Sequence, residues 1–123
     1  MNIQKLNGCL DGLRKDLGDG LLASSIVSTE DGQVLVATEG SNTAGATLLN
    51  EITASIREGL KTYPVELGQY YYIDVAGKMG ILAIPFGDYQ WAIVVNKKQV
   101  KLGLLLNIVL PKIINAFEDA VVS

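Results

Sequence analysis

The pair Asp31-Gly32 constrains the fold more than any other local feature of this sequence. It stands between two short runs of β-forming residues, 21–29 and 33–38. An Asp-Gly pair suits the positive φ angles of a two-residue hairpin turn. Because so short a turn allows no crossover, the two runs are predicted to be neighbouring antiparallel strands.

Two further turns extend this pattern later in the chain. Gly77-Lys78 separates residues 65–75 from residues 79–84, and its glycine stands where a type II′ turn requires one. Gly87-Asp88 then leads into residues 89–96, which are rich in aromatic and β-branched side chains. These three runs are predicted to form a meander, which brings the sheet to five mostly antiparallel strands.

Three segments have the period of an amphipathic helix. The first covers residues 3–17, with Asn2 as its cap and Gly18 at its end. The second covers residues 43–63, after turn and capping residues at 40–43, and stops before Pro64. The apolar stripes of these two helices consist of Ile3, Leu6, Leu10, Leu13 and Leu17, and of Leu49, Ile52, Ile56 and Leu60.

The last helix is predicted to follow a capping pair, Asn96 with Gln99, and to reach about Val122. Pro111 interrupts it, because proline removes one backbone hydrogen bond and clashes with the preceding turn. We therefore expect a helix that is either kinked near Asn107 or made of two pieces.

The predicted order is helix, two strands, helix, three strands, helix, an α/β (α+β) fold. Residues 81–84 and 92–95 are apolar at consecutive positions, which indicates that helices cover both faces of the sheet. We expect the first and last helices on one face and the middle helix on the other. A length of 123 residues fits a single domain, residues 1–123.

The composition argues against most kinds of chemistry. The chain has no histidine, so catalytic triads and the commonest zinc sites are excluded, and we expect neither a metal nor a cofactor. The single cysteine, Cys9, lies near the apolar stripe of the first helix and is interpreted as a packed side chain. No nucleotide-binding loop is present. The sequence therefore predicts a protein that is not an enzyme.

The charge and hydropathy patterns limit the partners. A net charge of −3 gives no broad basic field for nucleic acid. Lys97, Lys98 and Lys101 form a local exception, which we interpret as a solvated edge. We expect a cytoplasmic location and no membrane insertion, because no signal peptide or spanning segment is recognisable. Hydrophobic residues make up 49% of the chain, which suggests a buried interface with another protein.

Two groups of residues are candidates for a subunit interface. Tyr70 and Tyr72 share one face of the third strand, and tyrosine is enriched at protein interfaces. Beside the core stripe of the middle helix lie Ala44, Leu48, Ser55 and Gly59, a flank with small residues toward one end. The alternatives are ordinary strand filling for the tyrosines and neutral drift for Gly59.

The opposite side of the middle helix is a candidate docking face for another partner. The alternative interpretation is that this side of the helix is ordinary solvent-exposed surface with no partner. The residues proposed to contact that partner are Asn50, Glu51, Ala54, Arg57 and Glu58.

The chain resembles the Roadblock family of dynein light chains and GTPase-regulator domains. The residues that carry the resemblance are Leu10-Asp11-Gly12-Leu13, residues 25–37 of the first hairpin, and residues 91–95 of the last strand. The resemblance covers nearly the whole chain, although Pro111 departs from the uninterrupted last helix of the family.

The resemblance implies a homodimer or heterodimer in which middle helices pack side by side and third strands pair. Leu48, Ser55, Gly59, Tyr70 and Tyr72 would then form the dimer interface. It further implies a non-enzymatic scaffold that binds and regulates a small Ras-like GTPase. The alternatives are a motor or cargo adaptor that is indifferent to nucleotide, and a small-ligand sensor.

Overall fold

The computed structural model describes residues 1–38 and 43–123, with the backbone alone at 43 and 44. The cap predicted at residues 40–43 therefore lies largely outside the described residues. The elements are, in order, α1 (Ile3–Leu17), the short 3₁₀ turn η1 (Gly18–Gly20), β1 (Leu21–Ser28), β2 (Val34–Ala37), α2 (Thr43–Leu60), β3 (Tyr71–Asp74), β4 (Met79–Phe86), β5 (Tyr89–Asn96), α3 (Leu102–Leu104), the π-helical turn η2 (Leu105–Val109) and α4 (Leu110–Val122).

The predicted sheet is confirmed. Its strand order is β2-β1-β5-β4-β3, and every pairing in it is antiparallel. The long central strands β1, β5 and β4 pair along most of their length, from Ser28↔Tyr89 to Leu21↔Val95 and from Phe86↔Tyr89 to Met79↔Asn96. The short strands β2 and β3 lie at the two edges.

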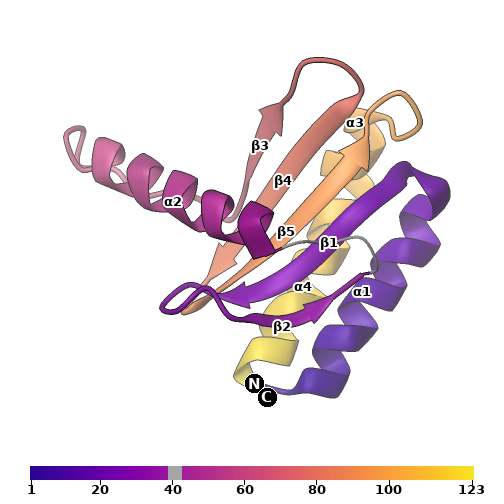
Figure 1. Ribbon diagram of the computed structural model, residues 1–123, viewed down its shortest axis with the longest axis horizontal. Helices are drawn as coiled ribbons and strands as arrows, with labels where there is room; N and C mark the ends of the chain where they lie inside the picture. Colours follow the sequence, from indigo (N-terminus) through magenta and orange to yellow (C-terminus); the bar gives the residue numbers. More distant parts are fainter. Residues whose placement is uncertain (39–42) are drawn as a thin grey trace.

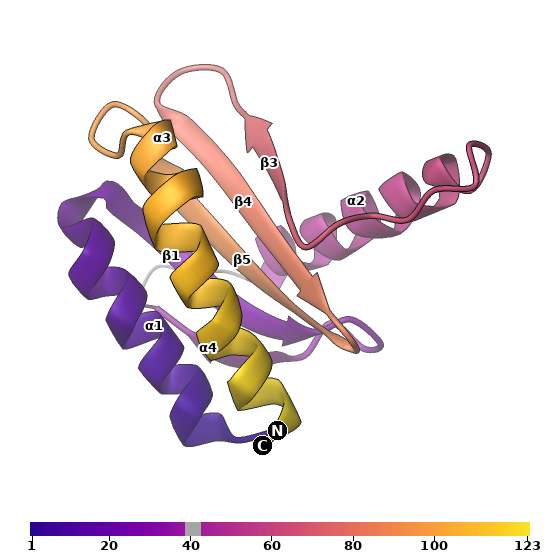
Figure 2. The same cartoon turned by 180° about the vertical axis from the view of Figure 1, so that it is seen from behind.

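The predicted layers are confirmed as well. α1 and α4 lie side by side on one face of the sheet, and α2 lies on the other face (Figures 1 and 2). The main hydrophobic core lies between the sheet and the pair α1 and α4. At its centre, the fully buried Trp91 and Phe117 meet edge to face with ring centroids 5.5 Å apart.

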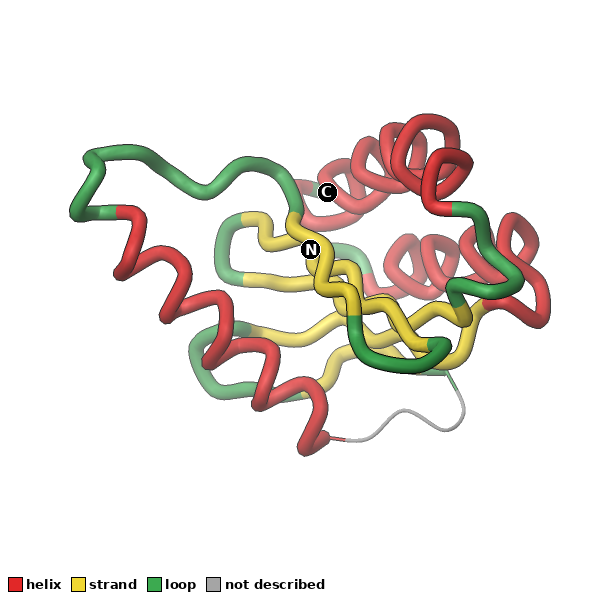
Figure 3. The backbone as a smooth tube through the Cα atoms, turned by 90° about the horizontal axis from the view of Figure 1, so that it is seen from above, coloured by secondary structure: helices red, strands yellow, loops and turns green. Residues whose placement is uncertain are grey.

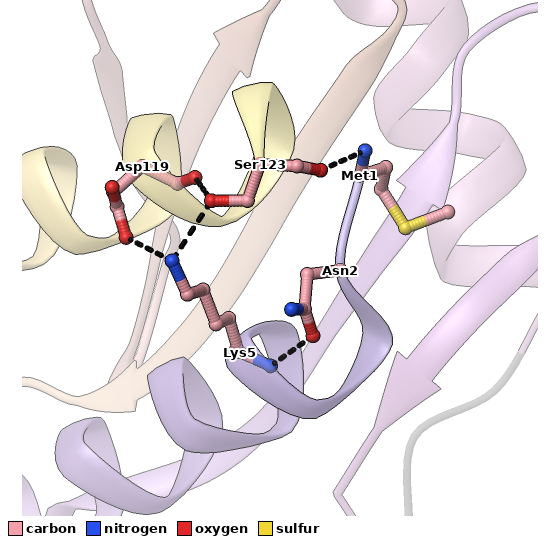
Figure 4. A network of polar contacts seen from close by, with 5 residues as sticks. All are labelled: Met1, Asn2, Lys5, Asp119 and Ser123. Carbon is pink, nitrogen blue, oxygen red and sulfur yellow. Dashed lines mark hydrogen bonds and ion pairs between the residues drawn. The ribbon is translucent and has the colours of Figure 1, made fainter.

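The two chain ends meet on this helical side of the molecule (Figure 4). The backbone N–H of Asn2 donates to the carbonyl of Ala120 over 2.9 Å. The Lys5 ammonium contacts the Asp119 carboxylate at 3.0 Å and the Ser123 hydroxyl at 2.9 Å. These contacts join the start of α1 to the end of α4, which are the two ends of the sequence.

α2 is attached to the sheet differently from the other helices. It crosses its face of the sheet at a steep angle, and its second half extends past the strands (Figures 1 and 3). Among the α2 side chains that are described, from Gly45 onward, the buried ones are Ala46, Leu49 and Thr53. The last turns of α2, after Thr53, therefore extend beyond the sheet.

The third strand is shorter than predicted. Residues 65–75 were expected to be extended, whereas β3 covers Tyr71–Asp74. Residues 61–70 instead run back along α2 toward the sheet, because the helix ends far from the strands (Figure 2). β3 begins at Tyr71, where the chain reaches β4 and pairs with it.

The first hairpin has a longer loop than its Asp-Gly pair predicts. β1 ends at Ser28 and β2 begins at Val34. Gly32 has the expected positive φ of 72°, but Asp31 accepts a hydrogen bond from the backbone of Gln33 over 3.0 Å. This side-chain bond stabilises a wider turn. The Gly77-Lys78 turn is wider as well, since β3 ends at Asp74 and β4 begins at Met79, whereas Gly87-Asp88 has the predicted two residues between β4 and β5.

The last helix begins later than predicted and is not broken. The side chain of Asn96 accepts from the backbone of Lys98 over 3.0 Å, which forms a local turn, and the helix begins at Leu102. The predicted irregularity falls at η2, where the N–H of Leu110 bonds the carbonyl of Leu105. One widened turn accommodates the ring of Pro111, which has no N–H to give the helix.

Candidate protein interface

A continuous chain of hydrogen bonds holds α2 on the sheet. The hydroxyls of Tyr71 on β3 and Thr53 on α2 lie 2.5 Å apart, and Thr53 donates to the Gln90 side-chain oxygen on β5 over 2.5 Å. Gln90 in turn donates to the Asn50 side chain over 3.0 Å, and Asn50 donates to the backbone carbonyl of Ser28 over 3.4 Å.

The Thr53 hydroxyl stands at the centre of this network. Its single hydrogen has two carbonyl acceptors within reach, the Gln90 side-chain oxygen at 2.5 Å and the Leu49 backbone oxygen at 3.0 Å, and its lone pairs can accept from Tyr71. Gln90 is fully buried among the sheet strands, and a buried amide without partners would be costly. Burial raises the pKa of the Tyr71 phenol above its ordinary value of 10.0. The network therefore holds the middle of α2, from Asn50 to Thr53, against the sheet.

This network corrects one predicted site residue. Asn50 was expected on the solvent side of α2, but it is half-buried and faces the sheet through its bonds to Gln90 and Ser28. Its polar side chain suggested exposure, because sequence pattern alone does not reveal a buried polar partner on another strand. The other predicted docking residues, Glu51, Ala54, Arg57 and Glu58, are exposed.

The predicted flank of α2 is exposed where the structure describes it. Leu48 is 57% accessible, and Ser55 and Gly59 are exposed as well. A Cβ at Gly59 would meet nothing within 4 Å, so no contact within the described residues requires glycine there. The flank also includes two half-buried side chains that the prediction assigned to the core, Ile52 and Ile56.

A hollow lies between α2 and the sheet. Its volume is about 160 Å³, and its lining is mainly apolar. Half-buried residues of the sheet form the floor of the hollow. Leu48 is one of the α2 residues that form its wall. The floor and wall include Ala23, Ile81, Ala92, Val94, Leu49 and Ile52. The apolar surface of α2 thus continues onto the open part of the sheet.

The strand β3 is an edge strand that α2 contacts, through the hydroxyls of Thr53 and Tyr71. Within the described part of the chain it pairs with β4 alone. Tyr70 is exposed beside it, whereas Tyr72 is half-buried, packs against the core on the α4 side and lies over Gly80. Tyr72 therefore contributes to the core of the single chain, and Tyr70 is exposed at the edge; the place of both in a dimer interface stays a prediction.

The described residues contain no cluster of three or more potential metal ligands. Cys9 is buried, and burial followed by the nearby Asp119 charge raises the pKa of its thiol. A raised pKa keeps the sulfur in its unreactive thiol form. No described helix is long and apolar enough to cross a bilayer.

This arrangement of an antiparallel sheet with two helices on one face and one on the other is the Roadblock-type fold. MglB from Myxococcus xanthus matches it with a TM-score of 0.80 and 16% identity over 95% of this chain and 87% of that chain. A structure of MglB with a tetrameric arrangement matches with a TM-score of 0.72 and 16% identity over 96% and 91% of the two chains.

The Roadblock/LC7 domain from Streptomyces avermitilis matches with a TM-score of 0.74 and 9% identity over 92% of this chain and 94% of that one. Neither a family model nor the sequence of a curated protein matches the chain. At these identities the structural likeness establishes the fold, and function has to be argued from the site.

Proposed function

We propose that this chain is a dimeric, non-enzymatic scaffold that binds and regulates a small Ras-like GTPase. The observation that carries the proposal is the exposed apolar flank of α2, which continues through the hollow onto the sheet and lies near the free edge of β3. Such a continuous surface on a small chain is typical of an interaction site.

A second copy of the chain would cover this surface. In a two-fold dimer the same patch meets itself, so one helical flank can pack against its symmetry mate. Ser55 and Gly59 would let the two helix backbones approach closely, with Leu48 and Ile56 filling the spaces beside them. The free edge of β3 would gain backbone partners from the other copy, which removes an exposed strand edge.

The proposal of a GTPase partner rests on the Roadblock resemblance and on the fold shared with MglB. The exposed side of α2 carries both signs of charge, through Glu51, Arg57 and Glu58 around the small Ala54. Mixed charge around a small residue suits recognition of a protein surface, since charge complementarity selects the partner and sets its orientation. Regulation by such a scaffold requires no catalytic group of its own.

Light scattering tests the dimer. We expect two chains per particle at micromolar concentration, and a folded monomer for Leu48→Asp combined with Ser55→Arg, because both changes place charge in the seam. Gln4→Lys, an exposed change on α1 on the opposite face of the sheet, is the matched control and should stay dimeric. A monomeric unmodified chain would rule the dimer out.

Binding to purified Ras-like GTPases, loaded with GDP or with a non-hydrolysable GTP analogue, tests the partner. Nucleotide-dependent binding that is weakened by Glu51→Lys with Arg57→Glu, in a chain that still dimerises, is the expected result. Binding that ignores the nucleotide would favour the motor or cargo adaptor. The absence of binding to any such GTPase would refute the GTPase partner and leave the dimer unaffected.

The small-ligand sensor has weaker support. The hollow of about 160 Å³ beside α2 is smaller than the roughly 300–1,000 Å³ of ordinary ligand pockets. A protein interface explains an open apolar hollow of this size without a ligand.

A further inference from the structure

Two loops meet at the end of the sheet where β3 turns into β4 and β5 leads into α3 (Figures 1 and 2). Lys97 joins them: its backbone N–H donates to the carbonyl of Lys78 over 2.7 Å, and its ammonium bonds the Val75 carbonyl over 2.7 Å. The same ammonium pairs with the Asp74 carboxylate. Lys97 therefore brings residues that are distant in sequence to one place.

The loops gather positive charge at this end. Lys78, Lys98 and Lys101 are exposed and form no ion pair within the described part of the chain. Asp74, the last residue of β3, is neutralised by Lys97, and the exposed Asp19 lies in η1, whose Gly20 packs against Val100, so this end holds three lysines, unpaired among the described residues, against the Asp19 carboxylate. The whole chain has a net charge of −3, so the part of the molecule outside these loops has a net charge more negative than −3.

Exposed aliphatic side chains lie beside these lysines. Leu102 is 45% accessible, Leu104 is 48% accessible and Ile108 is 64% accessible. Leu104 and Ile108 are four residues apart within the helix and lie on the same side of it, and Lys101 is the residue that precedes its first turn. We name this surface the lysine-leucine end: Lys78, Lys98, Lys101, Leu102, Leu104 and Ile108.

We propose that the lysine-leucine end docks on an anionic lipid membrane. The lysines would meet the lipid phosphates, and Leu104 and Ile108 would enter the boundary between headgroups and acyl chains. Lysine next to exposed aliphatic residues is the pattern of peripheral membrane surfaces. The acidic remainder of the molecule would be repelled by the same membrane, which fixes one orientation.

The composition of this surface separates a membrane from a protein partner. Protein interfaces are enriched in aromatic residues and arginine, and lysine is depleted there. The lysine-leucine end contains lysines and aliphatic side chains and none of the residues that anchor protein interfaces. Lysine is a point charge that suits a diffuse anionic surface, whereas arginine suits defined bidentate recognition. The membrane is therefore the better occupant.

Vesicle flotation of the purified chain tests the proposal. We expect binding to vesicles of phosphatidylserine with phosphatidylcholine, little binding to phosphatidylcholine alone, and release at high salt because screening weakens charge attraction. Each lysine near a membrane contributes about a fivefold factor in affinity, so Lys78→Gln, Lys98→Gln and Lys101→Gln together should weaken binding by about a hundredfold.

Leu104→Ser with Ile108→Ser should also weaken binding, and this loss should persist at low salt because it removes apolar contact rather than charge. Lys15→Gln with Lys61→Gln is the matched control: both lysines are exposed on other parts of the chain, and binding should not change. Circular dichroism confirms that each variant is folded. All of these positions are exposed, so the fold should tolerate the changes.

Three results would overturn the proposal: no binding of the unmodified chain to anionic vesicles at low salt, equal loss in the Lys15 and Lys61 control, or binding to a polyglutamate peptide without binding to vesicles. The last result would assign the surface to an acidic protein instead. The assay contains no GTPase, so its outcome is independent of the proposed function.

Discussion

The ring of Tyr72 on β3 lies directly over Gly80 on β4. A Cβ placed at position 80 would stand 2.0 Å from the Tyr72 phenol oxygen and 2.7 Å from the ring carbon that bears it. Tyr72 pairs with Leu82, so Gly80 is its diagonal neighbour across the two strands. The glycine leaves room for an aromatic ring to close the edge of the core.

Gly80→Ala should therefore destabilise the fold by about 1–3 kcal/mol, because the ring has to move out of a packed position. The loss should shrink in a Tyr72→Ala background, since neighbouring substitutions that share a contact are not additive. Gly12→Ala is the control. A Cβ there meets nothing within 4 Å, so alanine should stabilise the exposed side of α1 by about 0.5–1 kcal/mol. Urea unfolding measures all four variants.

Ser24→Ala should destabilise the fold by about 1–3 kcal/mol. Trp91 is fully buried and donates its indole N–H to the Ser24 hydroxyl over 2.7 Å, and that hydroxyl donates to the Ala92 carbonyl over 2.9 Å. The substitution leaves a buried indole N–H without an acceptor, which costs its full desolvation penalty. Ser25→Ala, at the adjacent buried position, should have a smaller effect. Equal losses for the two serines would contradict the role of the indole bond.

The stability of the fold should decrease in alkaline solution in a way that depends on Tyr71. Burial raises the pKa of its phenol in the folded protein above the ordinary value of 10.0. The unfolded chain therefore loses this proton first, so the contribution is full below pH 10.0 and is lost as pH rises through the folded pKa. Tyr71→Phe should flatten this part of the profile in urea unfolding at several pH values. An unchanged slope would show that Tyr71 does not titrate as described.

The two ends of the chain provide a comparison between a helix cap and a surface ion pair. Asn2 accepts from the backbone N–H of Lys5 over 3.1 Å, and Asn2→Ala should cost about 1 kcal/mol in thermal or urea unfolding. Lys5→Ala should cost less, about 0–1 kcal/mol, because the pair with Asp119 is largely exposed to water. The reverse order would mean that the contact between the chain ends is stronger than its exposure suggests.

Local signals predicted most of the fold. Asn2 and Gly18 are the caps of α1, as their types indicated, because a cap depends on the chain within a few residues of itself. The Gly87-Asp88 turn and the strands around it follow from the same short-range chemistry. The flank containing Leu48 could also be predicted, since helical period decides which side chains share a side.

Features that depend on distant parts of the chain were decided by the tertiary structure. Asn50 is polar, as surface residues usually are, yet its side chain faces the sheet because it bonds Gln90, 40 residues later in the sequence. Lys78 and Lys98 share a surface because Lys97 joins their loops, which no local pattern shows. Period and turn chemistry are properties of neighbouring residues, so the sequence by itself determined the elements and their order. The angle of α2, the length of β3 and the partners of buried polar groups depend on packing between elements, which exists only in the folded chain.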